Sequence, residues 1–503
     1  MKSLLVKTVV MAGLLALPFA ASAQYRNDAV TETSSESQLI IEQAKTSETP
    51  IIITLEQALQ IALSENVSVK VADMEIERTG YAKKGAYASL FPQIDMTGAY
   101  QRTIKKQVMY MDFDMSSLGG AMGGATGSGD GAGEGTGSEG SGDAGSSSSG
   151  SGGGLEVGRW NTWSAGVSAN MPLVNAQVWK SLKISGLDVE LAVEKARSSR
   201  LDMVTQVKNA YYSILFAKEA FNVYKEVYEN AVKNFEETKK KYDAEKISEM
   251  EFIRSKTTVA NAIPNVYNAE SSVILALWQL KAVLGVDLDL NLDVAGKLDD
   301  YAQQMFYDIH QNDEVTLDRN TTMKQLAIQA EMLAETIKLQ KYANIPSLAL
   351  GFNFSMNAMT NDFNFSEYRW TPYSYVGVSL AIPIFAGGKR YNQIRQAKNQ
   401  YQQVQLQTVN TERQLKIAIR QYLTTMETNM KSYYAAQDAV AAAQKGYDIA
   451  EKSYQVGRST LIQLNDAQLA LTQAQLAESQ AIYNFVSAKA SLEQTLGQDF
   501  ISE

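Results

Sequence analysis

The sequence predicts an α+β membrane protein built from two copies of one plan, in which short paired strands alternate with very long helices. Three observations predict this class. Landmark segments recur in the same order in both halves of the chain, and the hydrophobic period switches between about 3.6 and 2 residues. Proline-free helical stretches also exceed the length that any globular core requires. Each copy is therefore expected to run helix, strand, strand, long helix, tip and return helix.

The composition excludes several classes of function. The chain has 503 residues, a net charge of −9, no Cys and a single His, His310. An acidic chain lacks the positive field that binds nucleic acid, so no nucleic-acid partner is expected. Disulfides, thiolate chemistry and Cys/His zinc sites are excluded, and His310 stands in a polar linker without a nucleophile partner. An enzyme is the least favoured class, and no cofactor is expected.

The N-terminus has the three parts of a secretory signal peptide. Lys2 and Lys7 are followed by the apolar run Val9–Leu17 and by the small-residue site Ala21–Ala23. We expect residues 1–23 to be cleaved and residues 24–50 to be a flexible polar leader. No later apolar run has transmembrane-helix length, so the exported chain is either soluble or crosses a membrane as a β-barrel.

The repeat is defined by matched landmarks. Most pairs are 211 or 212 residues apart, whereas the first proline pair is 254 apart because only the first half carries the Gly/Ser-rich stretch 116–154. The pairs are Pro92 with Pro346, Pro172 with Pro383, Tyr211 with Tyr422, and Leu284–Asp287 with Leu496–Asp499. A shared order at a nearly constant offset indicates duplication.

The expected elements follow from this alignment. In the first repeat, 51–287, a helix from about Thr54 to Ser89 begins with a Thr54–Gln57 capping box and precedes a strand pair and two helices. An equatorial linker, 288–315, joins it to the second repeat, 316–499. The expected strand pairs are 92–112 with 158–172 and 346–357 with 372–383; the expected helices are 180–242, 248–284, 316–343, 389–454 and 460–496.

The strand segments alternate apolar and small or polar residues. In 346–357, for example, Leu348, Leu350 and Phe352 alternate with Ala349 and Gly351. This pattern suits a strand with lipid on one side and water on the other, although a soluble sandwich strand shows it too. Aromatic residues near the loop ends favour the membrane, where such rings form interfacial girdles. They are Trp160, Trp163, Tyr368, Trp370 and Tyr373.

Prolines mark the changes between helix and strand. Only eight occur in the chain, and Pro92, Pro172, Pro346 and Pro383 stand at the four expected joints. Proline neither continues a helix nor donates to a strand ladder, so it suits such positions.

Four strands cannot close a barrel, and open sheet edges are not tolerated in lipid. The missing strands must therefore come from other copies of the chain in a cyclic homo-oligomer. The long helices, which carry a small-residue coiled-coil seam, also need lateral neighbours, which a ring continuous with the barrel supplies. The number of copies in the oligomer does not follow from this reasoning.

Two segments carry a resemblance to a known family. They are Ile382–Gly388 at a strand-to-helix turn and, at the second tip, Tyr454–Gly457 followed by Leu464–Ala467. With the twofold plan, they make the chain from Thr54 to Asp499 resemble the TolC family of outer-membrane efflux and secretion channels. The resemblance implies a homotrimer with a twelve-stranded barrel in outer-membrane lipid of a Gram-negative bacterium. It also implies a periplasmic α-helical barrel, a periplasmic adaptor and an inner-membrane pump of RND, ABC or MFS type.

The resemblance also implies a gate at the periplasmic tips. In the family, two acidic residues of each chain surround an iris-like constriction at the periplasmic end. The corresponding residues here are Gln463 and Asp466. An Asp466 ring is expected to favour cations, although without the resemblance the favoured interpretation of Asp466 is a solvated surface acid. The family's latch tyrosine and its acid correspond to Tyr454 and Glu251. Where the family has a basic latch residue this chain has Ser459, so Arg458 and Arg254 are the candidate cations.

The remaining candidate residues follow from the same resemblance. The tips expected to contact the adaptor comprise Lys246, Ile247, Ser248, Val456, Gly457, Ser459 and Thr460. Gly387 and Gly388 complete the joint after Pro383.

The predicted function is a passive exit duct of an efflux or type I secretion system. A different class, a trimeric coiled-coil adhesin with a short membrane anchor, is disfavoured because such proteins do not duplicate their hairpins internally. The stretch 116–154 is expected to be a flexible extracellular loop. Its four acidic residues lack the regular nonapeptide spacing of calcium-binding repeats.

Overall fold

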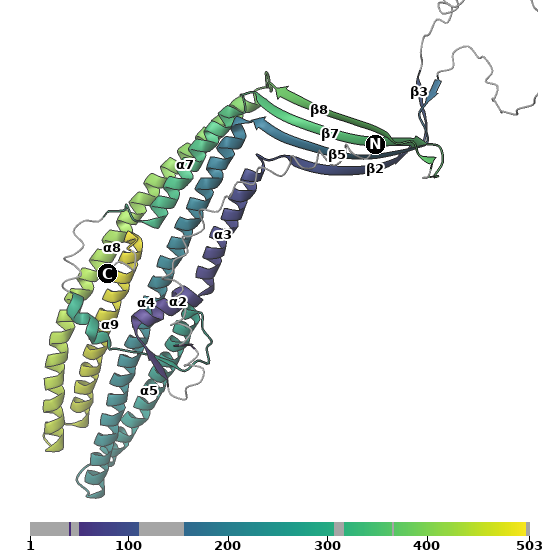
Figure 1. Ribbon diagram of the computed structural model, residues 1–503. Coiled ribbons are helices and arrows are strands. Elements are labelled where there is room, and N and C mark those ends of the chain that lie inside the picture. Colours follow the sequence, from purple (N-terminus) through teal and green to yellow (C-terminus); the bar gives the residue numbers. More distant parts are fainter. Residues whose placement is uncertain (1–39, 42–49, 110–154, 306–315, 365–366, 499–503) are drawn as a thin grey trace, which may run out of the picture. The chain divides into compact units, whose positions relative to one another are not determined.

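The computed structural model describes residues 40–41, 50–109, 155–305, 316–364 and 367–498 (Figure 1). Three regions with sequence predictions lie outside the described residues: the signal peptide 1–23, most of the leader 24–50, and the Gly/Ser-rich stretch 116–154; His310 also lies outside them. The chain divides into a helical unit and a sheet unit. The helical unit comprises residues 1–86, 179–341 and 387–503, and the sheet unit comprises 87–178 and 342–386.

The helical unit is dominated by two long helices and two return helices. The helices are α2 (Leu55–Glu65), α3 (Val67–Ala88), α4 (Ala176–Asp243), α5 (Glu249–Leu284), α7 (Thr321–Tyr342), α8 (Lys389–Gln455) and α9 (Leu461–Leu496), with the 3₁₀ helix η2 (Leu298–Gln304). The long helices α4 and α8 have 68 and 67 residues, and α5 and α9 have 36 each. The expected linker 288–315 contains η2 and the strand β6 (Leu292–Val294), which pairs in parallel with β1 (Ile51–Ile53).

The first predicted helix is wrong in one respect. The Thr54–Gln57 capping box is present, but the helix expected from Thr54 to Ser89 is divided at Asn66 into α2 and α3. The Asn66 side chain accepts a hydrogen bond from the Ser68 amide at 2.7 Å. Its amide group donates to the carbonyl of Val283, also at 2.7 Å. Asn66 thus caps α3 and fastens it to the last turn of α5.

The same joint recurs in the second half. Asn320 caps α7 by accepting from the Met323 amide at 2.9 Å, and it donates to the carbonyl of Thr495 at 2.6 Å. For this reason α7 begins at Thr321 rather than near the expected residue 316. The return helices end at Gly285 and Gly497, both with positive φ. A Cβ at Gly497 would overlap the Arg319 backbone, so glycine is required there.

The core of the helical unit surrounds the joint between the β1–β6 pair and the long helices. Tyr211 on α4 is 2% exposed and donates from its hydroxyl to the carbonyl of Ala295 at 2.6 Å. Burial raises the pKa of Tyr211 to about 12, so the phenol remains a donor.

A buried ion cluster fastens α7 to α4. Glu335 on α7 has a side chain that is only 3% exposed, and it accepts from Lys180 at 2.9 Å and Lys183 at 3.0 Å on α4. Lys338, one turn along α7, donates to the same carboxylate at 2.9 Å. Hydrogen bonds from Lys180, Lys338 and Lys183 hold the pKa of Glu335 at about 2, despite the opposing effect of burial.

The sheet unit contains four antiparallel strands in the order β2-β5-β7-β8. Their bounds are Gln93–Arg102, Asn161–Val174, Ser347–Thr360 and Thr371–Ala381. The first strand was expected to reach residue 112, but β2 ends at Arg102. A separate hairpin of β3 (Gln107–Met109) and β4 (Leu155–Val157) follows. β2 and β8 are the two edges of the four-stranded sheet.

Strand register gives the sheet one apolar face. Residues directly opposite one another point to the same side, so the chain of partners Met96, Val167 and Phe354 crosses three strands on one face. A second apolar row runs Ile94, Ala169, Phe352 and Val376 across all four strands. The opposite face carries the row Asp95, Ser168, Asn353 and Tyr375. The predicted alternation therefore yields a sheet with one apolar and one mainly polar face.

Candidate gate at the helix tips

The two helical hairpins turn through the same backbone motif. After α4, the amides of Glu245 and Lys246 donate to the carbonyls of Tyr242 and Lys241 at 2.8 and 2.9 Å. After α8, the amides of Gly457 and Arg458 donate to the carbonyls of Tyr454 and Ser453 at 3.1 and 2.8 Å. Both patterns are the Schellman ending of a helix, which requires a left-handed residue.

The left-handed position is occupied differently in the two tips. Gly457 has φ of 77°, and Glu245 has φ of 58°. Glu245 is the one non-glycine residue with positive φ in the part of the chain that the structure describes. A side chain in this conformation costs about 1 kcal/mol. The first tip therefore makes the same turn with a glutamate where glycine would be less strained.

Each return helix begins with a capping residue three positions before a predicted gate residue. Thr460 caps α9 and Gln463 completes its capping box, with its side-chain oxygen accepting from the Thr460 amide at 3.1 Å. Ser248 caps α5 and accepts from the Glu251 amide at 3.3 Å. Gln463 therefore holds the start of α9 in place of the acidic side chain that the resemblance implied at this position.

Tyr454 is buried between the two hairpins. It is 3% exposed, and its hydroxyl lies 2.8 Å from Oγ1 of Thr238 on α4. Thr238 donates its own proton to the Asn234 carbonyl at 2.7 Å, so Tyr454 must be the donor to Thr238. Burial raises the pKa of Tyr454, and the charge of Glu251 adds to this effect, so the hydroxyl keeps its proton.

Lys241 adds a second connection between the hairpins. Its Nζ donates to the carbonyls of Tyr454 and Gln455 at 3.1 and 3.4 Å and lies 4.6 Å from the centre of the Tyr454 ring. A cation at the end of α8 satisfies carbonyls that have no partner within the helix and also favours the helix dipole. An ion pair between Lys233 and Glu451 at 2.8 Å and a hydrogen bond from Asn465 to Thr258 at 3.2 Å further join the hairpins.

The other predicted tip residues are on the surface. Glu251, Ile247 and Ser459 are partly exposed, and no hydrogen bond joins Glu251 to Tyr454 among the described residues. Within the same residues, Arg254 makes no ion pair with Asp466 or Glu251. The exposed predicted residues are Lys246, Ser248, Arg254, Val456, Gly457, Arg458, Thr460, Gln463 and Asp466.

The sequence analysis missed Thr238 and Lys241. At the repeat offset of 212, their counterparts are Ala450 and Ser453, neither of which carries the same chemistry. The repeat therefore gave no reason to select them. A threonine and a lysine in the last two turns of a long polar helix carry no other local signal.

The predicted joints differ in their details. Pro92 and Pro346 directly precede β2 and β7, and Pro383 follows β8. Pro172 was expected at a joint but lies inside β5, which continues to Val174 through a register shift between Pro172 and Val174. A bulge accommodates a residue without an amide proton, so the strand does not end at this proline.

Two glycines form the turn before α8. Gly387 and Gly388 have φ of 56° and 77°, and Gly388 is the N-cap of α8. Successive left-handed residues are readily adopted only by glycine, so the Gly387–Gly388 pair fixes where this long helix begins.

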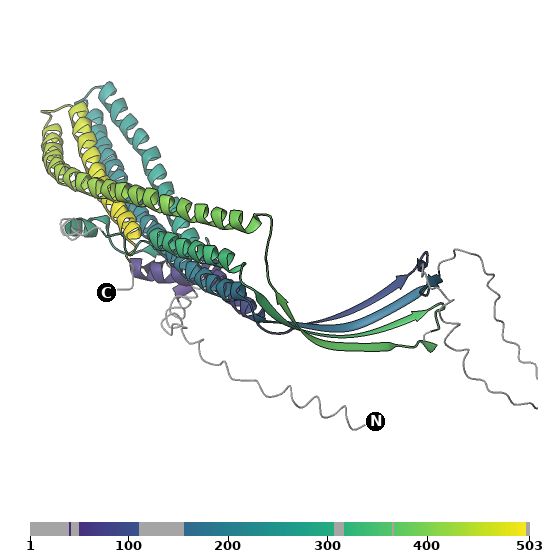
Figure 2. The same ribbon diagram turned by 90° about the horizontal axis from the view of Figure 1, so that it is seen from above.

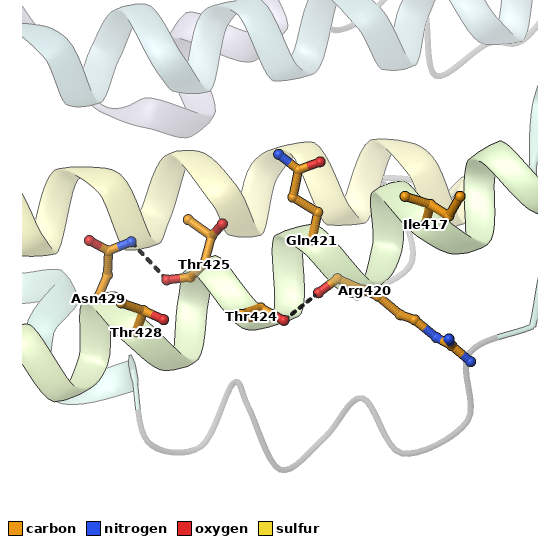
Figure 3. Close-up of a pocket in the computed structure, with 7 residues that line it drawn as sticks. All are labelled: Ile417, Arg420, Gln421, Thr424, Thr425, Thr428 and Asn429. Atoms are coloured by element: carbon orange, nitrogen blue, oxygen red, sulfur yellow. Dashed lines mark hydrogen bonds between the residues drawn. The ribbon is translucent and has the colours of Figure 1, made fainter.

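A shallow pocket lies on the surface of α8. Figure 3 shows its lining: Ile417, Arg420, Gln421, Thr424, Thr425, Thr428 and Asn429. Thr424 donates to the Arg420 carbonyl at 2.8 Å and Asn429 to the Thr425 carbonyl at 2.7 Å. Thr424 and Asn429 are thus bonded within their own helix, and Figure 3 shows Arg420 and Gln421 pointing away from each other, so these side chains do not converge on a ligand.

In the ranges that the structure describes, no three His, Cys, Asp or Glu residues are placed to hold a metal ion. No helix within those ranges is both long and apolar enough to cross a membrane.

Comparison with known proteins supports the predicted resemblance. The curated outer membrane protein TolC of Vibrio cholerae is 20% identical over 246 residues, which are 47% of this chain and 54% of that relative. The chain thus spans about half the length of the curated relative that it matches.

Two solved structures share the fold. The CmeC outer membrane channel of Campylobacter jejuni has a TM-score of 0.65 and 16% identity, covering 88% of this chain and 85% of that one. The MtrE outer membrane channel of Neisseria gonorrhoeae, in its open state, has a TM-score of 0.63 and 17% identity, covering 88% of each chain. The family model described as outer membrane efflux protein matches residues 139–286 and 314–498. The chain therefore belongs to the outer membrane efflux protein family.

Proposed function

We propose that the protein is the passive exit duct of an efflux system in the outer membrane of a Gram-negative bacterium. The observation that carries the proposal is the four-stranded sheet with one apolar and one mainly polar face. On its edge strands the apolar residues are highly exposed: Ile94 is 70%, Met96 81% and Val376 70% exposed. Such a face is stable against lipid, with the polar face toward water.

The sheet also requires other copies of the chain. Its edges, β2 and β8, present unpaired backbone groups, which lipid does not tolerate. We propose that β8 of one protomer pairs with β2 of the next, and that three copies close a twelve-stranded barrel. The family membership supports three copies, and the likeness of the two halves in helix length supports an internal duplication.

The helical unit supplies the periplasmic part of the duct in this proposal. Helices of 67 and 68 residues are about 100 Å long, far longer than a globular core requires. Exposed apolar residues along them, such as Ile417 and Leu406 on α8, need lateral partners, which neighbouring protomers provide. The exposed tips are proposed to meet a periplasmic adaptor coupled to an inner-membrane pump, in efflux or in type I secretion.

We place the gate at the tips. Tyr454, Thr238 and Lys241 hold the α8–α9 hairpin against the α4–α5 hairpin within one protomer. Opening requires the hairpins to separate, so these contacts favour the closed state. Glu251 is proposed to act on Tyr454 through its charge or through contact in another gate state. Asp466 is proposed to give the closed end a single acidic ring.

The proposal is tested by reconstituting the purified protein in a planar lipid bilayer. A duct that is closed at rest gives small, cation-preferring conductance steps, which increase when the tip contacts are removed. A protein that leaves the bilayer conductance unchanged with and without those contacts is not a channel of this kind.

A further inference from the structure

The charge of the helices is distributed unevenly between their two ends. Four helices end or begin next to a strand of the sheet: α3, α4, α7 and α8. Their strand-proximal twelve residues are 77–88, 176–187, 331–342 and 389–400, and these hold eleven Lys or Arg and three Glu, a net charge of +8. The whole chain has a net charge of −9. We call the Lys and Arg residues of these four segments the basic collar.

The opposite ends of the helices serve as an internal comparison. The twelve tip-proximal residues of α4, α5, α8 and α9 are 232–243, 249–260, 444–455 and 461–472. They hold eight Lys or Arg and eight Asp or Glu, a net charge of zero. General solubility would place charge at both ends alike, so the excess of positive charge is specific to the strand-proximal end.

The four collar segments lie at one end of the helical unit. Lys180 and Lys183 of α4 contact Glu335 of α7, and Arg200 of α4 pairs with Asp73 of α3. Lys324 of α7 and Glu412 of α8 line the same pocket, so these two helices are neighbours. Figure 1 and Figure 2 show α4, α7 and α8 side by side, and Figure 1 shows α3 alongside α4. All the charged collar residues belong to this unit.

Along α8 the collar segment contains no acidic residue. This segment carries Lys389, Arg390, Arg395 and Lys398, and the first acidic residue of the helix is Glu412. On α4 and α7 the collar lysines 180, 183 and 338 already contact Glu335. Of the four collar segments, the start of α8 therefore has the highest net positive charge in the sequence, +4.

Exposed aromatic residues accompany the collar. Tyr81 on α3, Trp179 on α4 and Tyr391 on α8 are 66%, 61% and 60% exposed. Lys84 lies 5.3 Å from the Tyr81 ring centre, and Arg395 lies 5.1 Å from that of Tyr391. Exposed Tyr and Trp beside Lys and Arg are the composition of a membrane–water interface, where the rings sit at headgroup level.

We infer that the basic collar binds the phosphate groups of anionic phospholipids in the leaflet that faces the periplasm. The inference rests on the proposed function, because it requires the sheet to span the membrane. The collar segments are joined to the strands by at most seven residues, between Ala381 and Lys389, which is within reach of the headgroups. Charge complementarity supplies the attraction, as it does for polybasic segments beside transmembrane helices.

The test compares lipids retained by the full-length protein. Wild-type protein is reconstituted in vesicles of equimolar phosphatidylglycerol and phosphatidylcholine, extracted in mild detergent, and its bound lipids are quantified by mass spectrometry. The collar predicts enrichment of phosphatidylglycerol by about threefold at low salt, decreasing at high salt. An equimolar bound fraction in the wild-type protein overturns the inference.

A matched pair of variants locates the binding. The collar variant combines Lys389→Gln, Arg390→Gln, Arg395→Gln and Lys398→Gln; the control combines Lys239→Gln, Lys240→Gln, Lys445→Gln and Lys452→Gln at the tips. Both remove four positive charges. The collar variant is expected to lose about half of the enrichment, and the control to retain it. Equal loss in both variants assigns the effect to net charge and overturns the inference.

The duct itself is checked in the same preparations by native mass and bilayer conductance. If the oligomer is intact and conducts but shows no phosphatidylglycerol enrichment, lipid binding by the collar is overturned and the proposed function is not. A protein that neither inserts nor conducts rejects the proposed function and, with it, the collar.

Discussion

At the scale of single residues, Tyr454 and Thr238 carry the contact between the two tips of one protomer. The hydroxyl–hydroxyl bond of 2.8 Å is buried, and Tyr454 can only donate to Thr238, because the Thr238 proton goes to Asn234. A buried hydrogen bond of this kind contributes about 1 kcal/mol, and removing one hydroxyl leaves the other buried without this partner.

Removal of this bond is expected to loosen the gate. Tyr454→Phe and Thr238→Val each remove the same contact, so each should raise the open probability by roughly fivefold, and the double variant should add little. Single-channel recording in a planar bilayer measures this. The internal repeat offers a control: Tyr242 stacks on Phe252 at 4.8 Å through its ring, so Tyr242→Phe should leave gating unchanged. Fully additive effects of the two variants would exclude a shared contact.

The proposed acidic ring at Asp466 gives a second prediction at this scale. Asp466→Asn should lower the ratio of cation to anion permeability by about twofold or more. Gln463→Glu should raise it, since glutamate completes the Thr460 capping box as glutamine does while adding a charge. Reversal potentials in a salt gradient measure both. An unchanged ratio in both variants would place these residues away from the conduction path.

At the scale of elements, hydrophobic periodicity predicted the sheet and the long helices because each repeats its pattern over many residues. The break at Asn66 could not be predicted, since no proline or glycine stands there and the bond that fastens Asn66 to α5 is to Val283, more than two hundred residues away. The same limit applies to Lys241 and Thr238, whose roles depend on Tyr454. The proline pattern also misplaced Pro172, because a strand admits proline at a bulge.

The docking of α7 on α4 is expected to depend on pH. Because the pKa of Glu335 is held at about 2, below its usual 4.5, its ion cluster stabilises the fold fully above pH 4.5. That stabilisation is lost as the pH falls from 4.5 toward 2. Glu335→Gln should therefore destabilise the protein by about 2 kcal/mol at neutral pH and progressively less below pH 4.5.

Thermal denaturation at several pH values measures this dependence. Glu412→Gln serves as the control, because Glu412 pairs with Lys416 at 2.6 Å on the exposed face of α8 and should have little effect. A Glu335→Gln deficit that is constant between pH 7 and pH 3 would assign the loss to packing instead of charge.

At the scale of the whole molecule, the proposed barrel depends on pairing of the sheet edges β2 and β8 between chains. In the proposed oligomer, other copies pair with the sheet edges and cover the exposed apolar residues of the long helices, while lipid covers the apolar face of the sheet. The number of copies could not be predicted from the sequence. Four strands per chain require only that the barrel contain a multiple of four strands, and several such barrels are closed. Family membership supports three.

The sharing of one barrel between several chains is tested by the native mass of the protein extracted from outer membranes in mild detergent. The account predicts a stable species with three times the mass of one protomer. A monomer, or a species found in the periplasmic fraction, would contradict it, because the β2 and β8 edges would then remain unpaired and no barrel would form.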